Sequence, residues 1–424
     1  MRVLIVNTSE KTGGAAVASN RLMQALNQSG VKAKMLVKDK ETDHLTVTQL
    51  PHQALKRLHF LWERWCIFCH LHFCKRHLFH VDMANVGSDI TSLPEFQEAD
   101  IIHLEWINQG MLSLRNIQKI LESGKPVVWT LHDMWPATGI CHLTLSCQNF
   151  KTQCGNCMYL PHHGSQNDLS HRVWKRKQKV YASGNIRFVA CSNWLAAQAK
   201  ASGLLQNHAV TVIPNPIDTH LFAPNDKVAA ARRLGLPADK QLVLFASQRV
   251  TNENKGIRYL IEACNQLVAV HPDMKDRVGL VMLGGHAEEL DGAFSLPTYS
   301  LGYVNDTKKI VDVYNAVDVF VLPSLSENLP NTIMEAMSCG VPCVGFDVGG
   351  IPEMIDHLQN GYVARYKDAA SLAEGIAWIL DKDTNGAELS RRCIHKVQTA
   401  YAQQHVAKRY LGIYQEAMEE GRRL

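Results

Sequence analysis

Two glutamates separated by seven residues, Glu327 and Glu335, are well placed to bind a polar ligand. Glu327 lies in a turn-rich loop that ends in Pro330 and Asn331, and Glu335 lies in the segment of helix-forming composition that follows. A carboxylate accepts hydrogen bonds from sugar hydroxyls, and the unpaired N–H groups that open a helix favour a phosphate. The two glutamates and the loop between them therefore suit a ligand that carries both groups, such as a sugar nucleotide.

The elements that must position these residues can be read on either side of the loop. Residues 317–322 hold a single charge, at the second position, which is typical of a buried parallel strand. Residues 332–337 favour a helix that Gly340 and Pro342 end, and residues 343–346 predict the next strand. Ligands of open α/β sheets bind beyond the carboxyl ends of the strands. We therefore expect a ligand site here; the alternative is that both glutamates only cap or solvate the helix.

The string from Ser326 to Pro342, followed by Gly-Gly-Ile-Pro-Glu at 349–353, resembles the retaining glycosyltransferases of family 4 (group 1), of the bacterial polysaccharide-biosynthesis type. That resemblance implies an α/β chain of the GT-B class, with two Rossmann-like domains that face each other across a cleft. It also implies a nucleotide diphosphate sugar as donor and a saccharide or lipid-linked saccharide as acceptor. No catalytic metal is expected.

The resemblance assigns roles to residues of the second half. Glu335 would bind ribose hydroxyls, and Glu327 would bind the sugar and diphosphate. Arg249 and Lys255 would stabilise the departing nucleotide, because two fixed cations can neutralise its growing charge; the alternative is that both are solvated. The other expected donor contacts in this half are the backbone of Val304, near the nucleobase, and the loop residues Asn328, Leu329, Pro330 and Asn331.

Residues of the first half also follow predicted strands. Residues 2–7 predict a strand, and Gly13 and Gly14 lie in the loop behind it, where glycines let the backbone approach a donor phosphate; a plain turn is the alternative. Residues 101–104 and 127–131 predict two further strands, and the second delivers His132 at its carboxyl end. The resemblance implies that His132 lies near the reacting sugar carbon. Otherwise, it only hydrogen-bonds within its loop.

Length and charge bound the organisation of the chain. The 424 residues suffice for two domains, and Pro214–Asp218 resembles the family's hinge. We predict an acceptor-binding domain over 1–217, a nucleotide-sugar-binding domain over 218–395, and a helix over 396–424 that crosses back to the first. Residues 1–217 hold 23 Lys/Arg against 14 Asp/Glu, a net +9, whereas 218–424 hold 21 against 26, a net −5. No nucleic-acid-binding motif accompanies the basic half, so nucleic acid is not expected as a partner.

Residues 52–80 mix apolar and aromatic side chains with five Lys/Arg and six histidines. The run is too short and too charged to span a bilayer, but basic, aromatic amphipathic helices bind anionic membrane surfaces. The alternative is a helix packed on its own domain with a solvated basic edge. Because the first strand starts at once and leaves no room for a signal peptide, we expect a cytoplasmic protein, peripheral to the inner face of the membrane if residues 52–80 bind it.

Four cysteines, Cys141, Cys147, Cys154 and Cys157, have the spacing Cys-x5-Cys-x6-Cys-x2-Cys in a loop rich in polar residues. In a reducing compartment, such a set favours a structural zinc ion over disulfides. Free thiols in a packed loop are the alternative, and the family resemblance does not imply zinc.

Together with these residues, the resemblance implies a retaining glycosyltransferase of the hexosyltransferase type that acts in cell-surface polysaccharide biosynthesis. Two other functions stay open: a sugar-nucleotide epimerase on the same scaffold, and a non-catalytic partner subunit of a glycosyltransferase.

Overall fold

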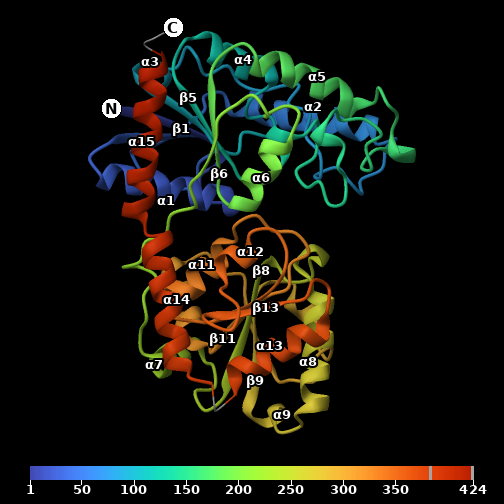
Figure 1. Cartoon of the computed structure of the whole chain (residues 1–424), viewed down its shortest axis with the longest axis vertical. Helices are drawn as coiled ribbons and strands as arrows, with labels where there is room; N and C mark the ends of the chain where they lie inside the picture. Colours follow the sequence, from blue (N-terminus) through green and yellow to red (C-terminus); the bar gives the residue numbers. More distant parts are fainter. Residues whose placement is uncertain (382–383, 422–424) are drawn as a thin grey trace. The chain divides into compact units, whose positions relative to one another are not determined.

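The computed structural model describes residues 1–381 and 384–421 and divides the chain into two compact units (Figure 1). Unit 1 comprises residues 1–216 together with the helix α15 (Gln403–Gly421), and unit 2 comprises residues 217–402. Each unit has a parallel sheet with helices on both faces. The predicted class, an α/β chain with two Rossmann-like domains, is confirmed.

Over the described residues, the sheet of unit 1 has seven parallel strands. Their order is β3 (Val47–Gln49), β2 (Lys32–Asp39), β1 (Arg2–Ser9), β4 (Ile101–Leu104), β5 (Val127–Leu131), β6 (Ile186–Ala190) and β7 (Val210–Val212). The side chains of β1 alternate between two cores: Leu4 and Val6 pack on one face, and Val3 and Ile5 on the other. This period of two explains why a strand covered on both faces reads as an unbroken apolar run.

Two helices, α1 (Gly14–Gln28) and α15, cover one face of this sheet, while the remaining helices of the unit lie elsewhere around it (Figure 1). Those helices are α2 (Gln53–His70), α3 (Pro94–Glu98), α4 (Leu114–Glu122), α5 (Leu169–Tyr181) and α6 (Asn193–Ala201). Val406, Tyr410 and Tyr414 of α15 are buried in the same core as β1 and α1. A helix that follows all of unit 2 in the sequence is therefore part of the core of unit 1.

Over the described residues, the sheet of unit 2 has six parallel strands. Their order is β10 (Thr298–Gly302), β9 (Val278–Gly285), β8 (Gln241–Arg249), β11 (Val319–Leu322), β12 (Cys343–Phe346) and β13 (Gly361–Ala364). Its helices are α7 (Lys227–Leu234), α8 (Ile257–Val270), α9 (Met274–Arg277), α10 (Thr307–Ala316), α11 (Asn331–Ser338), α12 (Ile351–Met354), α13 (Ala369–Leu380) and α14 (Gly386–Ala400). Because β8 and β11 are adjacent parallel strands, the loops that follow them are neighbours at the carboxyl end of the sheet.

Two expectations about helices need correction. The predicted boundary between 395 and 396 falls inside α14, which belongs to unit 2 as a whole; the chain leaves that unit only after Ala402. In addition, the solvated basic edge that was the alternative for residues 52–80 is present only in part. Lys56 and Arg64 are buried, whereas leucines and tryptophans of the same helix are exposed.

Candidate active site

In unit 2, three loops at the carboxyl ends of β8, β11 and β12 pack backbone to backbone at two glycines. A methyl carbon at Gly256 would lie 1.7 Å from the carbonyl oxygen of Pro323, and one at Gly349 would lie 1.7 Å from that of Glu327. Both glycines have positive φ, +73° and +61°. Such close backbone approach is open to glycine alone, and a positive φ favours glycine as well. The position of Glu327 is therefore set by backbone contacts.

This packing brings two of the predicted residues into contact. The Lys255 ammonium forms an ion pair with Oε1 of Glu327. The Glu327 side chain is 13% exposed and that of Lys255 is 33% exposed, so the pair is open to a ligand. A lysine beside a glutamate presents one cation and one acceptor group at the same point, as a phosphorylated sugar requires.

The second glutamate lies within helix α11. Glu335 is almost buried, and its Oε2 accepts a hydrogen bond of 2.9 Å from the hydroxyl of Tyr314 on α10. Asn331 is the first residue of α11, and Pro330 before it supplies no side-chain cap. Asn328 and Leu329 complete the loop. The N-terminus of a helix, which favours anions, thus lies between the two carboxylates in the sequence.

Two other residues predicted on the donor side lie at the carboxyl end of the same sheet. Arg249 ends β8 and is 58% exposed; it donates to the Thr251 hydroxyl at 2.9 Å and lies 3.5 Å from Glu289. Val304 follows β10, the outermost strand on this side. Because all six strands are parallel, the loops after β8 and β10 lie at the same carboxyl end of the sheet as Glu327.

In unit 1, His132 follows β5 as predicted and forms a pair with a residue that the sequence analysis missed. Its Nε2 lies 2.6 Å from Oε2 of Glu105, the first residue after the neighbouring strand β4. Glu105 is 3% exposed. Burial alone would lower the pKa of His132, but interactions with the Cys191 sulfur and the Glu105 carboxylate raise it well above the usual value. The signal was present in the sequence, because Glu105 directly follows a predicted strand.

The pair is continued by a buried chain of polar groups that leads to α15. Nε2 of His103 lies 3.4 Å from Oε1 of Glu105, and its Nδ1 shares a hydrogen bond of 2.7 Å with the Tyr414 hydroxyl. Thr130 links the same histidine, at 2.7 Å, to the Tyr410 hydroxyl, at 2.9 Å. Buried polar groups that satisfy one another hold a single geometry. The orientation of the Glu105 carboxylate is therefore tied to α15.

A second histidine is held beside this pair by the residue that follows His132. Oδ2 of Asp133 lies 2.8 Å from Nδ1 of His142 and accepts a hydrogen bond of 2.8 Å from the indole of Trp106. Burial would lower the pKa of His142, but Asp133 and Asp82 raise it to about 9. His142 is therefore a cation at neutral pH. Nothing in its spacing from His132 pointed to this role in the sequence.

The glycine loop after β1 lies at the start of α1. Gly13 precedes the helix with φ of +96°, and Gly14 is its first residue. Glu10 is fully buried and accepts hydrogen bonds from the backbone N–H groups of Glu41 and Thr42, at 2.6 and 2.9 Å. The loop therefore has a defined conformation at the helix N-terminus. Gly13 and Gly14 remain predicted donor contacts.

The four-cysteine loop joins β5 to α5 with only short 3-10 turns in between. Cys141, Cys154 and Cys157 are buried, Cys147 is half-buried, and Cys141 interacts electrostatically with the other three thiols. Burial raises the pKa of Cys154 to about 12 and that of Cys157 to about 11. Within the described ranges, however, no three His, Cys, Asp or Glu side chains are arranged as the ligands of a metal ion. The thiols are thus gathered but not closed on one point, and a zinc ion here stays a prediction.

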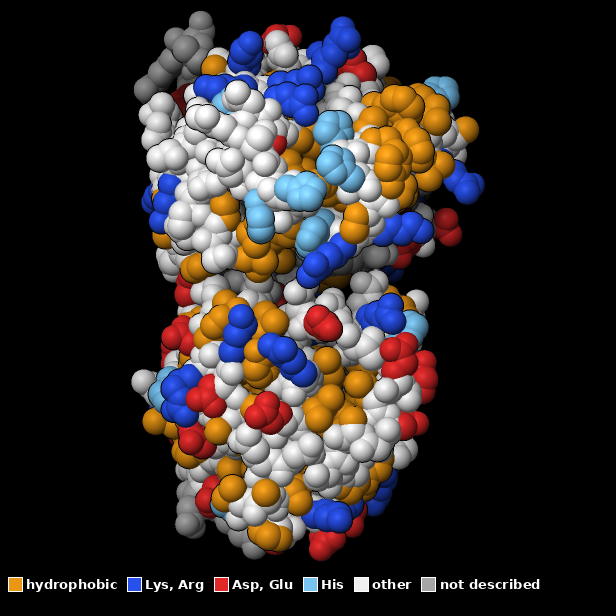
Figure 2. Space-filling view, turned by 90° about the vertical axis from the view of Figure 1, so that its right-hand side faces the viewer, with side chains coloured by type: hydrophobic (Ala, Val, Ile, Leu, Met, Phe, Trp, Pro, Cys, Tyr) orange, Lys and Arg blue, Asp and Glu red, His pale blue; other side chains and the backbone are white. Residues whose placement is uncertain are grey.

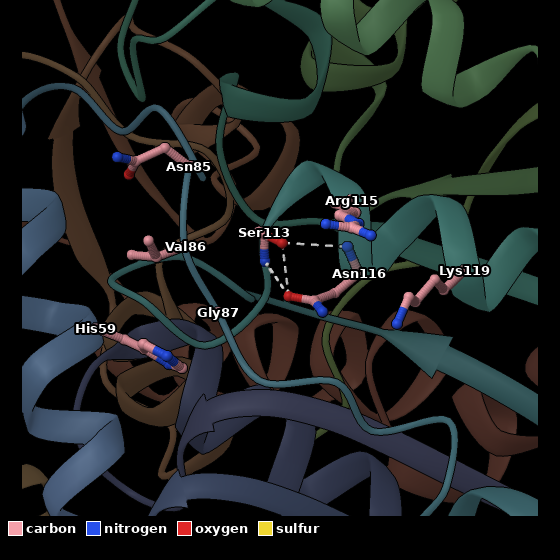
Figure 3. A pocket seen from close by; sticks show the side chains of 8 residues that line it. All are labelled: His59, Asn85, Val86, Gly87, Ser113, Arg115, Asn116 and Lys119. Atoms are coloured by element: carbon pink, nitrogen blue, oxygen red, sulfur yellow. Dashed lines mark hydrogen bonds between the residues drawn. The ribbon is translucent and has the colours of Figure 1, made fainter.

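A pocket of about 380 Å³ lies elsewhere in unit 1, where the sequence predicted no site (Figure 3). Its polar groups are largely engaged within the chain. Ser113 and Asn116 cap the first turn of α4 by hydrogen-bonding each other, as the dashed lines show, and Lys119 pairs with Asp89. We assign no ligand to it. The residues that line it are His59, Asn85, Val86, Gly87, Ser113, Arg115, Asn116 and Lys119.

Comparison with known proteins gives the family. Residues 12–221 match the model of Glycosyltransferase Family 4, and residues 240–382 match that of the Glycosyl transferases group 1. A D-inositol 3-phosphate glycosyltransferase of Acidothermus cellulolyticus is 29% identical over 226 residues, or 50% of this chain and 49% of that protein. The chain thus spans about half the length of this relative, and of two further proteins of the same name.

Solved structures show the same fold. The sucrose-phosphate synthase of Thermosynechococcus elongatus superposes with a TM-score of 0.67 at 17% identity, over 99% of this chain and 100% of that one. HepE of Anabaena in complex with UDP-glucose gives a TM-score of 0.62 at 17% identity, over 98% and 100% of the two chains. The fold is that of the GT-B glycosyltransferases. Within that class, the chain belongs to the group 1 glycosyltransferases of family 4.

Proposed function

We propose that this glycosyltransferase moves a sugar from a nucleotide diphosphate sugar to a saccharide or lipid-linked saccharide acceptor, with retention at the anomeric carbon, in cell-surface polysaccharide biosynthesis. The observation that carries the proposal is the Lys255–Glu327 pair, held by loops that pack at two glycines next to the N-terminus of α11. UDP-glucose in the Anabaena protein supports UDP-sugars as the first donors to test.

Each group then has a chemical task. Glu335, oriented by Tyr314, accepts hydrogen bonds from the ribose hydroxyls. Lys255 and Arg249 offset the negative charge that grows on the departing nucleotide, a role that needs fixed cations close to the phosphates. Glu327 accepts from the donor sugar. His132, held by Glu105, serves the acceptor side. No metal is assigned to the reaction.

The test measures nucleotide release from a panel of UDP-, GDP- and ADP-sugars, with and without an acceptor mixture, for the wild type and for Glu335→Gln. Loss of a hydrogen bond to a charged group costs about 1.5–3 kcal/mol, so kcat/KM should fall roughly 10- to 150-fold. Glu262→Gln is the matched control, because Glu262 is exposed on α8 and accepts a hydrogen bond from Gln266 on the same helix.

The outcomes separate the alternative functions. Acceptor-dependent release that is lost in Glu335→Gln supports the transferase, and NMR of the product then decides whether the anomeric configuration is retained. Conversion of the donor without any acceptor would instead identify a sugar-nucleotide epimerase. Tight donor binding without turnover would identify a non-catalytic partner subunit.

A further inference from the structure

Helix α2 buries charged side chains and exposes apolar ones, the reverse of an ordinary surface helix. Its charged residues Lys56, Glu63 and Arg64 are buried together with Ile67. Five of its large apolar side chains, together with one phenylalanine from the following turn, are between 45% and 64% exposed: Leu55, Leu58, Leu61, Trp62, Trp65 and Phe73. A solvated helix normally places its apolar stripe toward the core. This orientation therefore needs a physical cause.

The inward charged groups supply that cause. Nζ of Lys56 donates to the carbonyl oxygen of Lys38 at 2.9 Å, and Glu63 accepts the backbone N–H of Ala84 at 2.7 Å. Arg64 lies 3.0 Å from the buried carboxylate of Asp82. Rotating α2 to hide its apolar face would strip these groups of their partners, which is costly for buried charges. The exposed apolar face is thus a fixed property of unit 1.

The turn after α2 extends the same face. His72 and Phe73 both adopt the left-handed backbone conformation, with φ of +51° and +63°. Residues other than glycine rarely adopt it. The result is an aromatic cluster in which the Phe73 ring lies 5.5 Å from Phe68 and 6.4 Å from Trp65. A strained turn that leaves its aromatic ring exposed gains nothing from the core of the unit.

Within residues 51–80, the exposed charged side chains have one sign. Arg57, Lys75 and Arg76 are exposed, whereas the single acidic residue between 51 and 80, Glu63, is buried. Figure 2 shows a face of unit 1 on which apolar side chains and histidines gather, with lysine or arginine side chains nearby. Tryptophan is favoured at the boundary between lipid and water, and lysine and arginine are attracted to anionic lipid headgroups.

We propose that this face, formed by the six exposed apolar residues above with Arg57, Lys75 and Arg76, docks onto the surface of an anionic lipid bilayer. The protein would lie on the bilayer, since no helix in the described part of the chain is long and apolar enough to cross one. A two-fold contact with a second copy is disfavoured because it would bring the same three cations together, and residues 51–80 offer no exposed acidic partner. The inference does not depend on the proposed function.

Vesicle flotation of the full chain tests it. The wild type is mixed with vesicles of phosphatidylcholine alone, or with added phosphatidylglycerol, and compared with the double variant Trp62→Ser/Trp65→Ser. We expect the wild type to float with the anionic vesicles, and the double variant to partition about tenfold or more weakly, because two large apolar side chains no longer enter the interface. Val270→Ser, at a residue that is 70% exposed in unit 2, should float like the wild type.

Other outcomes would overturn the proposal. A wild type that stays at the bottom, equal flotation with both vesicle types, or equal flotation of the double variant would each contradict it. Light scattering without vesicles covers the remaining occupant: a dimer that the double variant loses would show that a second copy covers the face. Thermal unfolding of each variant confirms that the chain is folded, and nucleotide release with a water-soluble acceptor is expected to be unchanged.

Discussion

Replacing Glu105 by glutamine removes the negative charge beside His132 while keeping the shape of the side chain. The two residues are 2.6 Å apart, and both are largely buried, so the hydrogen bond is charge-assisted and poorly screened. Bonds to charged groups contribute about 1.5–3 kcal/mol. A domain of 150–250 residues loses roughly 2–4 °C in Tm per kcal/mol. We therefore expect the unfolding transition of unit 1 to move down by about 3–12 °C.

The pH dependence distinguishes this electrostatic role from simple packing. The pKa of His132 is raised in the folded state, so its contribution to stability is complete below the unfolded value of about 6.5. That contribution is lost as the pH rises through the raised folded pKa. Glu105→Gln should therefore differ most from the wild type at low pH, and the difference should shrink toward high pH.

Urea unfolding of the wild type and of Glu105→Gln from about pH 6 to about pH 10 measures this change. Glu122→Gln is the matched control, because Glu122 is exposed on α4 and accepts a hydrogen bond from Gln118 on the same helix. A loss of stability that is the same at every pH would refute the charge argument. No loss at all would show that the pair contributes nothing to the fold.

Two further predictions concern the loops. Gly349→Ala should destabilise unit 2 by more than about 1–2 kcal/mol and weaken donor binding, because strain at positive φ adds to a clash with the Glu327 carbonyl oxygen. Urea unfolding measures the loss of stability. Gly235→Ala is the control and should show the strain alone, because a methyl carbon at Gly235 meets nothing within 4 Å. If zinc binds the four-cysteine loop, elemental analysis of the purified protein should find about one zinc ion per chain. Cys154→Ser should lose the zinc ion, whereas the control Cys264→Ser should keep it. A wild type without zinc would exclude the site.

The sequence predicted well wherever burial leaves an unbroken apolar run. The strands at 101–104, 127–131 and 343–346 appear with the predicted bounds, because parallel strands covered on both faces have one kind of side chain throughout. Among the strands that were not predicted from the sequence are β2 and β3. Lysines at Lys32 and Lys34 interrupt the apolar pattern of β2, and β3 has only three residues.

The candidate site was predictable for the residues carried by one local string and not for those joined by the fold. Glu327 and Glu335 belong to the same strand, loop and helix, so their neighbourhood follows from their spacing. The partner of His132 comes from the adjacent strand, 27 residues earlier. The sequence left the orientation of α2 open, because the partners of Lys56 and Arg64, Lys38 and Asp82, lie outside the helix.

The place of α15 has a consequence for synthesis on the ribosome. Tyr410 and Tyr414 are core residues of unit 1, yet they are made after all of unit 2. Domains fold as units as the chain emerges, and residues 217–402 are all available before the last piece of unit 1 exists. We therefore expect the second unit in the sequence to reach its native state first. Until α15 has been made, the apolar residues of β1 and α1 that pack against it stay uncovered. We expect the chain to be most prone to aggregate at this stage.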